Sequence, residues 1–150
     1  MRGLVDDVAA QLRFERDARR QRFTYARECD GRRLRYRFPI DVPVHDHERL
    51  VTVEFNVARS PARPVAHIEG PRCLRHRYAD DSLCMWLDTD PPGKRWLTEE
   101  GLLELVRHVE VHAYCEAECR AGHSWPKPES PGRHLRSPAC PTCHGRCSRR

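Results

Sequence analysis

The sequence has few lysines, few hydrophobic residues and no long apolar run. Lys94 and Lys127 are its lysines, so nearly all of the positive charge behind a net charge of +5 comes from arginine. Hydrophobic residues make up 39% of the chain, which is low for a globular protein, and charged residues make up 33%. These values predict a compact core under a highly charged surface. Because no stretch is long and apolar enough to cross a membrane, we expect no membrane partner.

A signal peptide is not expected either, because Asp6 and Asp7 interrupt the segment that would have to be apolar. We therefore expect a cytoplasmic protein. In that compartment the eight cysteines are expected to be thiols, metal ligands or nucleophiles rather than disulfides. The arginines are scattered among acidic residues and form no continuous basic stripe, which disfavours nucleic acid as a partner.

Hydrophobic periodicity predicts an α+β domain. Residues 3–20 are expected to form a helix whose apolar face holds Leu4, Val5, Val8 and Leu12. Alternating residues on both sides of the turn sequence Asp30-Gly31 then predict a hairpin. Two further strands are expected over residues 51–57 and 65–68.

The second half is expected to contain a long loop and a helix. Residues 70–95 show no sustained period, and loops of this length in small domains tend to be functional. A helix should begin at Thr98 as its N-cap, continue to about Arg120 and end at Gly122. Its buried stripe is expected to hold Leu102, Val106, Val109 and Ala113. Residues 1–125 are predicted to be the domain, and residues 126–150 a tail rich in Pro, Arg and Cys.

One cysteine of the long loop stands out by its position. Cys84 lies between Leu83 and Met85, directly after a polar, turn-rich stretch, in RHRYADDSLCMW. Its thiol is a buried apolar group, a metal ligand, half of a disulfide or a nucleophile. A nucleophile must be accessible while its neighbours anchor it to the core, and Leu83 and Met85 are suited to that anchoring.

The order of helix, four-stranded meander, long loop with a cysteine and helix resembles the ubiquitin-conjugating enzymes. In that family a His-Pro-Asn signature precedes the catalytic cysteine, with the Asn eight residues before it. Here His76 stands at that distance from Cys84, and Trp96 resembles a downstream Trp of the family. The loop is more similar to H-x-Y-x-D-G-S-L-C of bacterial members from antiphage and ubiquitin-like conjugation operons, with Asp81 in place of the Gly.

A second stretch carries the same resemblance. The bacterial members have a later series of His, Glu, Gly, Trp-Pro and Glu, to which the chain is similar at His112, Glu116, Gly122, Trp125, Pro126 and Glu129. The resemblance extends over roughly residues 1–134. It implies an α+β, ubiquitin-conjugating-enzyme-like fold with an N-terminal helix, a four-stranded antiparallel meander, a long active-site loop and C-terminal helices.

The resemblance implies that Cys84 carries a modifier protein as a thioester and passes it to an amine. His76 is expected either to hydrogen-bond the oxyanion formed during aminolysis or to hold the loop in shape. Tyr78, Asp80 and Asp81 are expected to orient or deprotonate the incoming amine. The alternatives are a structural thiol at Cys84 and a solvated turn for the two aspartates.

The implied partners are an activating enzyme, a ubiquitin-like modifier and a target protein that offers an amine. In antiphage operons the transferred protein can instead be a nucleotidyltransferase of the cyclic-dinucleotide-signalling type, joined through its C-terminus. No cofactor is expected for catalysis. The implied biological setting is bacterial antiphage defence.

The C-terminal stretch predicts a structural zinc site. CPTCHGRC places Cys140, Cys143, His144 and Cys147 close together, and a C-x-x-C pair can hold one tetrahedral ion. The helix before it carries Cys115 and Cys119 one turn apart, so a zinc ion joining the two would order the tail. The alternative is a tail that binds no metal. Cys29 and Cys73 have no partner that the sequence identifies.

Two other functions remain open alongside modifier transfer. The first is a non-catalytic zinc-binding module that binds protein or nucleic acid and does not depend on Cys84. The second is an adaptor with the conjugating-enzyme fold that has lost catalysis. A cysteine hydrolase is less favoured, because His76 has no evident group to orient it as a general base.

Overall fold

The computed structural model describes residues 3–42, 44–45, 47–58, 63–73, 76–86 and 90–127. It shows an α+β chain with one N-terminal α-helix, a four-stranded sheet and one further α-helix after it, as expected in outline. The tail residues Glu129, Cys140, Cys143, His144 and Cys147 lie outside the described residues.

The sheet is an antiparallel meander. Its strands are β1 (Ala26–Cys29), β2 (Arg33–Val42), β3 (His47–Asn56) and β4 (Val65–Ile68), adjacent in chain order. β2 and β3 pair along their whole length, whereas β1 and β4 are short edge strands. The predicted turn is confirmed: Gly31 has a φ of 80°, and the Asp30 carboxylate accepts hydrogen bonds from the backbone of Arg32 and Arg33.

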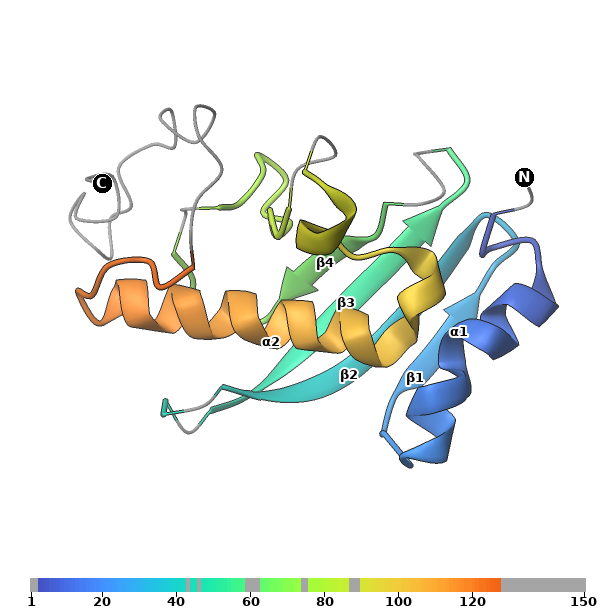
Figure 1. Ribbon diagram of the computed structural model, residues 1–150, viewed down its shortest axis with the longest axis horizontal. Coiled ribbons are helices and arrows are strands. Elements are labelled where there is room, and N and C mark those ends of the chain that lie inside the picture. The colour runs from blue at the N-terminus through green and yellow to red at the C-terminus, as the bar shows by residue number, and fades with distance from the viewer. Residues whose placement is uncertain are drawn as a thin grey trace.

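Both α-helices cover the same face of the sheet. Helix α1 (Val8–Arg20) packs on α2 (Gly101–Arg120), and α2 runs across the strands (Figure 1). Every second residue of the two central strands is buried toward these helices, including Tyr36, Phe38, Val53 and Phe55. The opposite face is polar, with Arg35 paired to Glu54 at 2.7 Å. One-sided burial explains why alternation identified the strands.

The predicted apolar face of the first helix is correct at Leu4 and Val5, which are buried, but wrong at Val8 and Leu12. Val8 is 67% exposed and Leu12 is 49% exposed, while Phe14, Ala18 and the polar Glu15 are buried. The reason is tertiary, since the Glu15 carboxylate accepts hydrogen bonds from Tyr36, Tyr25, Arg19 and Arg27, and these partners select the buried face. The α-helix also begins at Val8 rather than at residue 3.

The start of the last helix differs from the prediction as well. Thr98–Glu100 form a short 3-10 turn, η2, without a side-chain cap from Thr98, and α2 begins at Gly101. The Glu100 carboxylate accepts a hydrogen bond from the Leu97 backbone instead. The stripe of Leu102, Val106, Val109 and Ala113 is buried as predicted.

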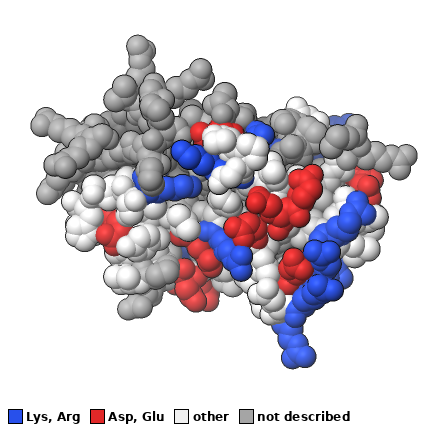
Figure 2. All heavy atoms as spheres, viewed as in Figure 1, with Lys and Arg blue, Asp and Glu red and all other residues white. Residues whose placement is uncertain are grey.

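The surface carries mixed charge. Exposed arginines gather along α1, and acidic side chains lie beside them over the start of α2 (Figure 2). Within the described residues, no helix combines the length and hydropathy that a membrane span requires.

Candidate functional site

The loop that carries Cys84 is tied back onto the sheet. The Leu83 amide donates to the Ala66 carbonyl of β4 at 2.9 Å, and the Cys84 amide donates to the His76 carbonyl at 2.7 Å. Leu83 is buried in the core and Met85 packs against it, which confirms their predicted anchoring role. Trp96 is buried beneath, in contact with the ring of Phe14. Cys84 is therefore held at a defined place directly beside the backbone of His76.

The Cys84 side chain is largely covered, with an exposed fraction of 8%. Cys29, by contrast, is exposed on the edge strand β1. A thioester must therefore approach Cys84 through the small part of its surface that is exposed.

His76 lies between this cysteine and the end of α2. Its backbone has a φ of 56°, in the left-handed region, and its side chain is buried. Its ring centroid lies 4.3 Å from that of Trp125, which is also 5.3 Å from the ring of His112. The two stretches singled out in the sequence therefore meet here, although His112 follows Cys84 by 28 residues (112 − 84).

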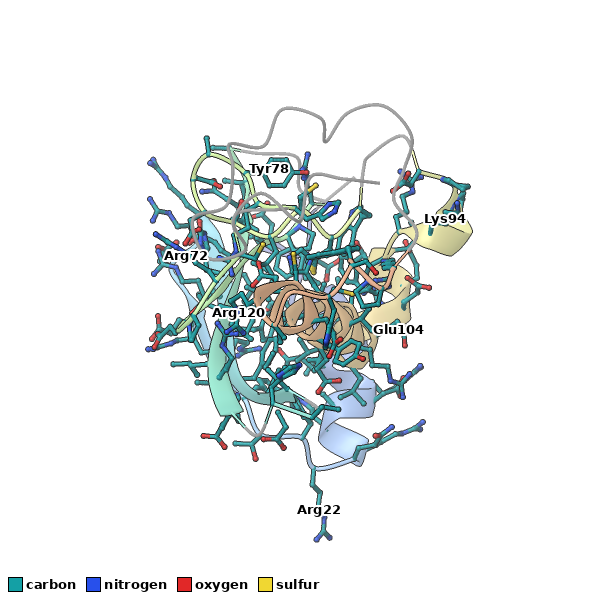
Figure 3. The ribbon with its side chains drawn as sticks, turned by 90° about the vertical axis from the view of Figure 1, so that its left-hand side faces the viewer. Arg22, Arg72, Tyr78, Lys94, Glu104 and Arg120 are labelled. Carbon is teal, nitrogen blue, oxygen red and sulfur yellow. The ribbon has the colours of Figure 1, made fainter. Side chains whose placement is uncertain are left out.

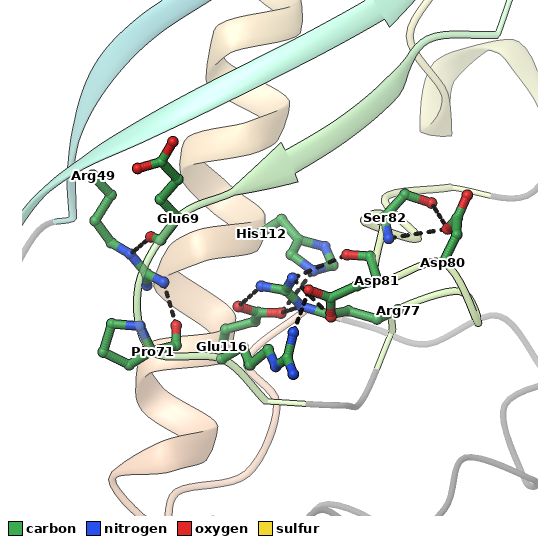
Figure 4. A network of polar contacts seen from close by, with 10 residues as sticks. Arg49, Glu69, Pro71, Arg77, Asp80, Asp81, Ser82, His112 and Glu116 are labelled. Atoms are coloured by element: carbon green, nitrogen blue, oxygen red, sulfur yellow. Dashed lines mark hydrogen bonds and ion pairs between the residues drawn. The ribbon is translucent and has the colours of Figure 1, made fainter.

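A buried ion pair joins the same two stretches (Figure 4). Arg77, next to His76, donates to both carboxylate oxygens of Glu116 on α2 at 2.6 and 2.9 Å. His112 Nε2 lies 3.5 Å from the same carboxylate. Burial alone would raise the pKa of Glu116, but its two hydrogen bonds from the Arg77 guanidinium outweigh burial and hold that pKa below its ordinary value. Glu116 is therefore ionised and fixes the loop to the helix.

The aspartates of the loop are engaged in local structure. Asp80 accepts hydrogen bonds from the backbone and hydroxyl of Ser82 at 3.1 and 2.5 Å. Asp81 has a φ of 66° and pairs with Arg72 at 2.5 Å and Arg77 at 3.3 Å. Both contacts support the turn interpretation, and neither shows an aspartate presented to an incoming amine.

Tyr78 is exposed, as is Asp80 among the candidate residues. Tyr78 is 37% exposed, and it lies above α2 in the view along that helix (Figure 3). The Arg63 guanidinium lies 4.8 Å over its ring and donates to its hydroxyl. The Tyr78 ring is therefore an exposed part of the loop that already has a cation over one face.

Arg49 is a residue of the site that the sequence interpretation missed. It lies on the inward-facing register of β3, is only 5% exposed, and donates to the carbonyls of Glu69 and Pro71 (Figure 4). These contacts fix the point where the loop leaves β4. The sequence does contain a sign of this role, because Arg49 alternates in phase with Val51, Val53 and Phe55. A charged side chain on the buried face of a strand needs buried polar partners.

The predicted metal ligands fall in two groups. Cys115 and Cys119 are buried on α2, and burial raises the pKa of the Cys115 thiol. The other four predicted ligands lie outside the described residues. Among the residues that the structure describes, no group of three or more metal-ligating side chains converges. The predicted zinc ligand set therefore remains a prediction.

No protein-family model, no curated protein and no solved structure matches this chain. The functional assignment consequently depends on the geometry above and on the resemblance seen in the sequence.

Proposed function

We propose that this chain is a ubiquitin-conjugating-enzyme-like carrier, with Cys84 as the residue that accepts a ubiquitin-like modifier. The observation that carries the proposal is the meeting of two separate motifs at one place. The Cys84 amide binds the His76 carbonyl, and the His76 ring contacts Trp125, a residue of the second motif. The order of α-helix, antiparallel meander, loop and α-helix supports the same fold family.

Two backbone conformations give independent support. His76 stands where the family has Asn, and its φ of 56° lies in the region where Asn, Asp and His are enriched. Asp81 stands where bacterial relatives often have Gly, and its φ of 66° lies in the region that favours glycine. Both positions thus have the backbone geometry that suits the residues of the family.

The proposed reaction has two acyl transfers. The Cys84 thiolate attacks the carbonyl carbon of the thioester on the activating enzyme, a new carbon–sulfur bond forms, and the thiolate of that enzyme leaves. A target amine then attacks the carbonyl of the Cys84 thioester, loses a proton and expels the Cys84 thiolate. A neutral His76 imidazole can donate its N–H to the oxyanion of the second step. The sequence of steps needs no cofactor.

The decisive experiment is a charging assay. The chain is mixed with ATP and with the activating enzyme and modifier from its own gene neighbourhood, and intact mass is measured without reductant. We expect a thiol-labile adduct that is absent in Cys84→Ala and thiol-resistant in Cys84→Ser. The matched control Cys29→Ser, an exposed cysteine far from the loop, should charge normally. An unchanged thiol-labile adduct in Cys84→Ala would contradict the assignment of the nucleophile.

The same assay tests the role of His76. His76→Asn retains a side chain that can donate a hydrogen bond and tolerates the left-handed backbone, whereas His76→Ala removes the donor. If the imidazole binds the oxyanion, the His76→Ala variant should still form the thioester at Cys84 but should transfer the modifier to amines about 10²-fold more slowly. The His76→Asn variant should transfer it at nearly the rate of the natural chain. Equal discharge rates for both variants would assign His76 to loop structure alone.

The burial of Cys84 favours a second candidate, the adaptor without catalysis. It predicts binding to the activating enzyme or modifier with no covalent adduct. If the activating enzyme and the modifier react with each other but never form an adduct on Cys84, the adaptor is the correct assignment.

A further inference from the structure

The chain reverses its direction directly after α2. Gly122 has a φ of 91°, and its amide donates to the Cys119 carbonyl, while the His123 amide donates to the Glu118 carbonyl. These two hydrogen bonds form a Schellman motif, which ends a helix and lets the chain turn back. His123 Nδ1 also lies 2.6 Å from a carboxylate oxygen of Glu118. The segment that follows α2 is therefore fixed to the last turn of that helix.

Trp125, in this segment, contacts two buried histidines from different parts of the chain. Its ring centroid lies 4.3 Å from that of His76 and 5.3 Å from that of His112, with interplanar angles of 39° and 74°. The first distance is shorter than the roughly 4.5–7 Å common for aromatic pairs, so the indole is in direct contact with the His76 imidazole. Both histidine side chains are buried.

The backbone contacts of His76 do not fix the orientation of its imidazole. The Cys84 amide binds the His76 carbonyl, and the neighbouring Arg77 is paired with Glu116 on α2. These contacts hold the main chain, but the χ2 torsion of histidine has a broad distribution and selects no single ring orientation. A hydrogen-bond donor in catalysis must be held within roughly 10–20° of its productive orientation. A contact with the ring itself is therefore needed, and Trp125 provides one.

Trp125 is in turn held by α2. The His112 ring packs against the indole, and His112 Nε2 lies 3.5 Å from the Glu116 carboxylate that Arg77 binds (Figure 4). A closed circuit of contacts thus joins His76, Trp125, His112, Glu116 and Arg77, which follows His76 in the chain. A side chain that is packed and hydrogen-bonded on several sides keeps one rotamer, which is the property that a positioning group requires.

We propose that Trp125 is a positioning residue that holds the His76 imidazole in the orientation needed to donate to the oxyanion of aminolysis. This inference rests on the proposed function for the reaction itself. It adds a residue that does not touch the substrate, and it gives the segment after α2 a role in the site. Loss of the indole should slow transfer of the modifier to amines and leave formation of the Cys84 thioester unchanged.

The test compares Trp125→Leu with Trp125→Phe. Leucine removes the aromatic face, whereas phenylalanine retains a ring that can stack on the imidazole. Trp125→Leu should form the thioester normally and transfer the modifier about 10-fold more slowly, and Trp125→Phe should recover most of the rate. Tyr114→Leu is the matched control, because Tyr114 is an aromatic residue of α2 whose ring lies near His45 instead. It should transfer at the natural rate.

A double-mutant cycle separates positioning from general support of the fold. If Trp125 acts through His76, Trp125→Leu should slow transfer by less than about 2-fold in a His76→Ala background, because no imidazole remains to be oriented. A purely structural role predicts the same loss in both backgrounds. Equal losses in both backgrounds, or a natural transfer rate in Trp125→Leu, overturn the proposal.

Proton NMR of the natural chain measures the contact without any partner. The ring current of Trp125 should shift the His76 imidazole signals, assigned from their absence in His76→Asn, away from those of an exposed histidine. Trp125→Leu should lose this shift and Tyr114→Leu should keep it. A chain that forms the thioester but shows no shift overturns the positioning alone. A chain that shows the shift but never forms the thioester with active partners contradicts the proposed function, and with it the catalytic role of the contact.

Discussion

Asp81 shows how one residue of the loop combines strain with an ion pair. An L-residue in the left-handed region is disfavoured by about 1–2 kcal/mol relative to glycine, although aspartate tolerates it better than most. Here the carboxylate pairs with Arg72 and with the buried Arg77. The contact offsets part of the backbone cost, so the natural residue is a compromise between conformation and charge.

We predict that Asp81→Gly and Asp81→Ala differ in stability although both remove the carboxylate. Glycine relieves the strain at a φ of 66°, whereas alanine retains it. The alanine variant should be less stable than the glycine variant by about 1 kcal/mol. Chemical denaturation of both variants measures the difference. Equal stabilities would show that the loop adopts another backbone conformation at this position.

At the scale of elements, the attachment of α1 depends on a face that mixes apolar and ionised groups. Phe14 contacts Tyr36, Phe55 and Trp96, with ring centroids 5.3 to 5.9 Å apart. Next to it, burial would raise the pKa of Glu15, but its hydrogen bonds to Arg19, Tyr25 and Tyr36 lower it overall. The charged carboxylate is thus part of the interface between helix and sheet.

The observed face of α1 predicts opposite outcomes for two substitutions on the same helix. Phe14→Ala removes a buried ring and should cost about 3–5 kcal/mol of the free energy of unfolding. Val8→Ala changes a side chain that is 67% exposed and should alter that free energy by less than about 0.5 kcal/mol. Denaturation by urea compares them. A large loss of the free energy of unfolding in Val8→Ala would instead support the apolar face predicted from the sequence.

The contact between α1 and α2 depends on Gly101. Its φ is 82°, and a Cβ there would lie 3.1 Å from the Phe14 carbonyl oxygen. Gly101→Ala should therefore destabilise the chain by about 1–3 kcal/mol, because it combines backbone strain with a close contact. Gly93→Ala is the matched control, since a Cβ there meets nothing within 4 Å. Equal melting temperatures for the two variants would contradict this account.

At the scale of the whole molecule, two buried carboxylates connect parts that are distant in sequence. Glu15 joins α1 to the sheet, and Glu116 joins α2 to the Cys84 loop. Both have pKa values below the ordinary 4.5. A carboxyl whose pKa is lowered by folding stabilises the folded state above its unfolded pKa, and that stabilisation is lost as the pH falls through the folded pKa.

We therefore predict that the free energy of unfolding falls as the pH drops from 7 to below 4.5. Glu116→Gln leaves the guanidinium of Arg77 buried without its carboxylate, which should cost about 3 kcal/mol at pH 7. It should also make the acid dependence shallower, because one of the carboxyls whose pKa is lowered by folding no longer titrates. Denaturation curves at several pH values test both statements. An acid dependence as steep as that of the natural chain would exclude Glu116 as a linked group.

The sequence by itself determined the order of the strands, the buried stripe of α2 and the place of Cys84 in a loop, although β3 begins at His47 rather than at the predicted residue 51. These features depend on alternation or helical spacing of apolar residues, and such patterns are local because one face of each element is buried. The turn at Asp30-Gly31 and the helix end at Gly122, whose φ is 91°, were predictable for the same reason.

Only the tertiary structure decided which polar residues are buried and which distant residues meet. Glu15, Arg49 and Glu116 are buried because each finds partners far along the chain, and no local pattern reports such partners. The contacts of His76 with Trp125 and of Cys73 with Cys119 likewise arise where the loop folds over the end of α2. The sequence thus indicates the chemical groups, and long-range packing determines which of them can act together.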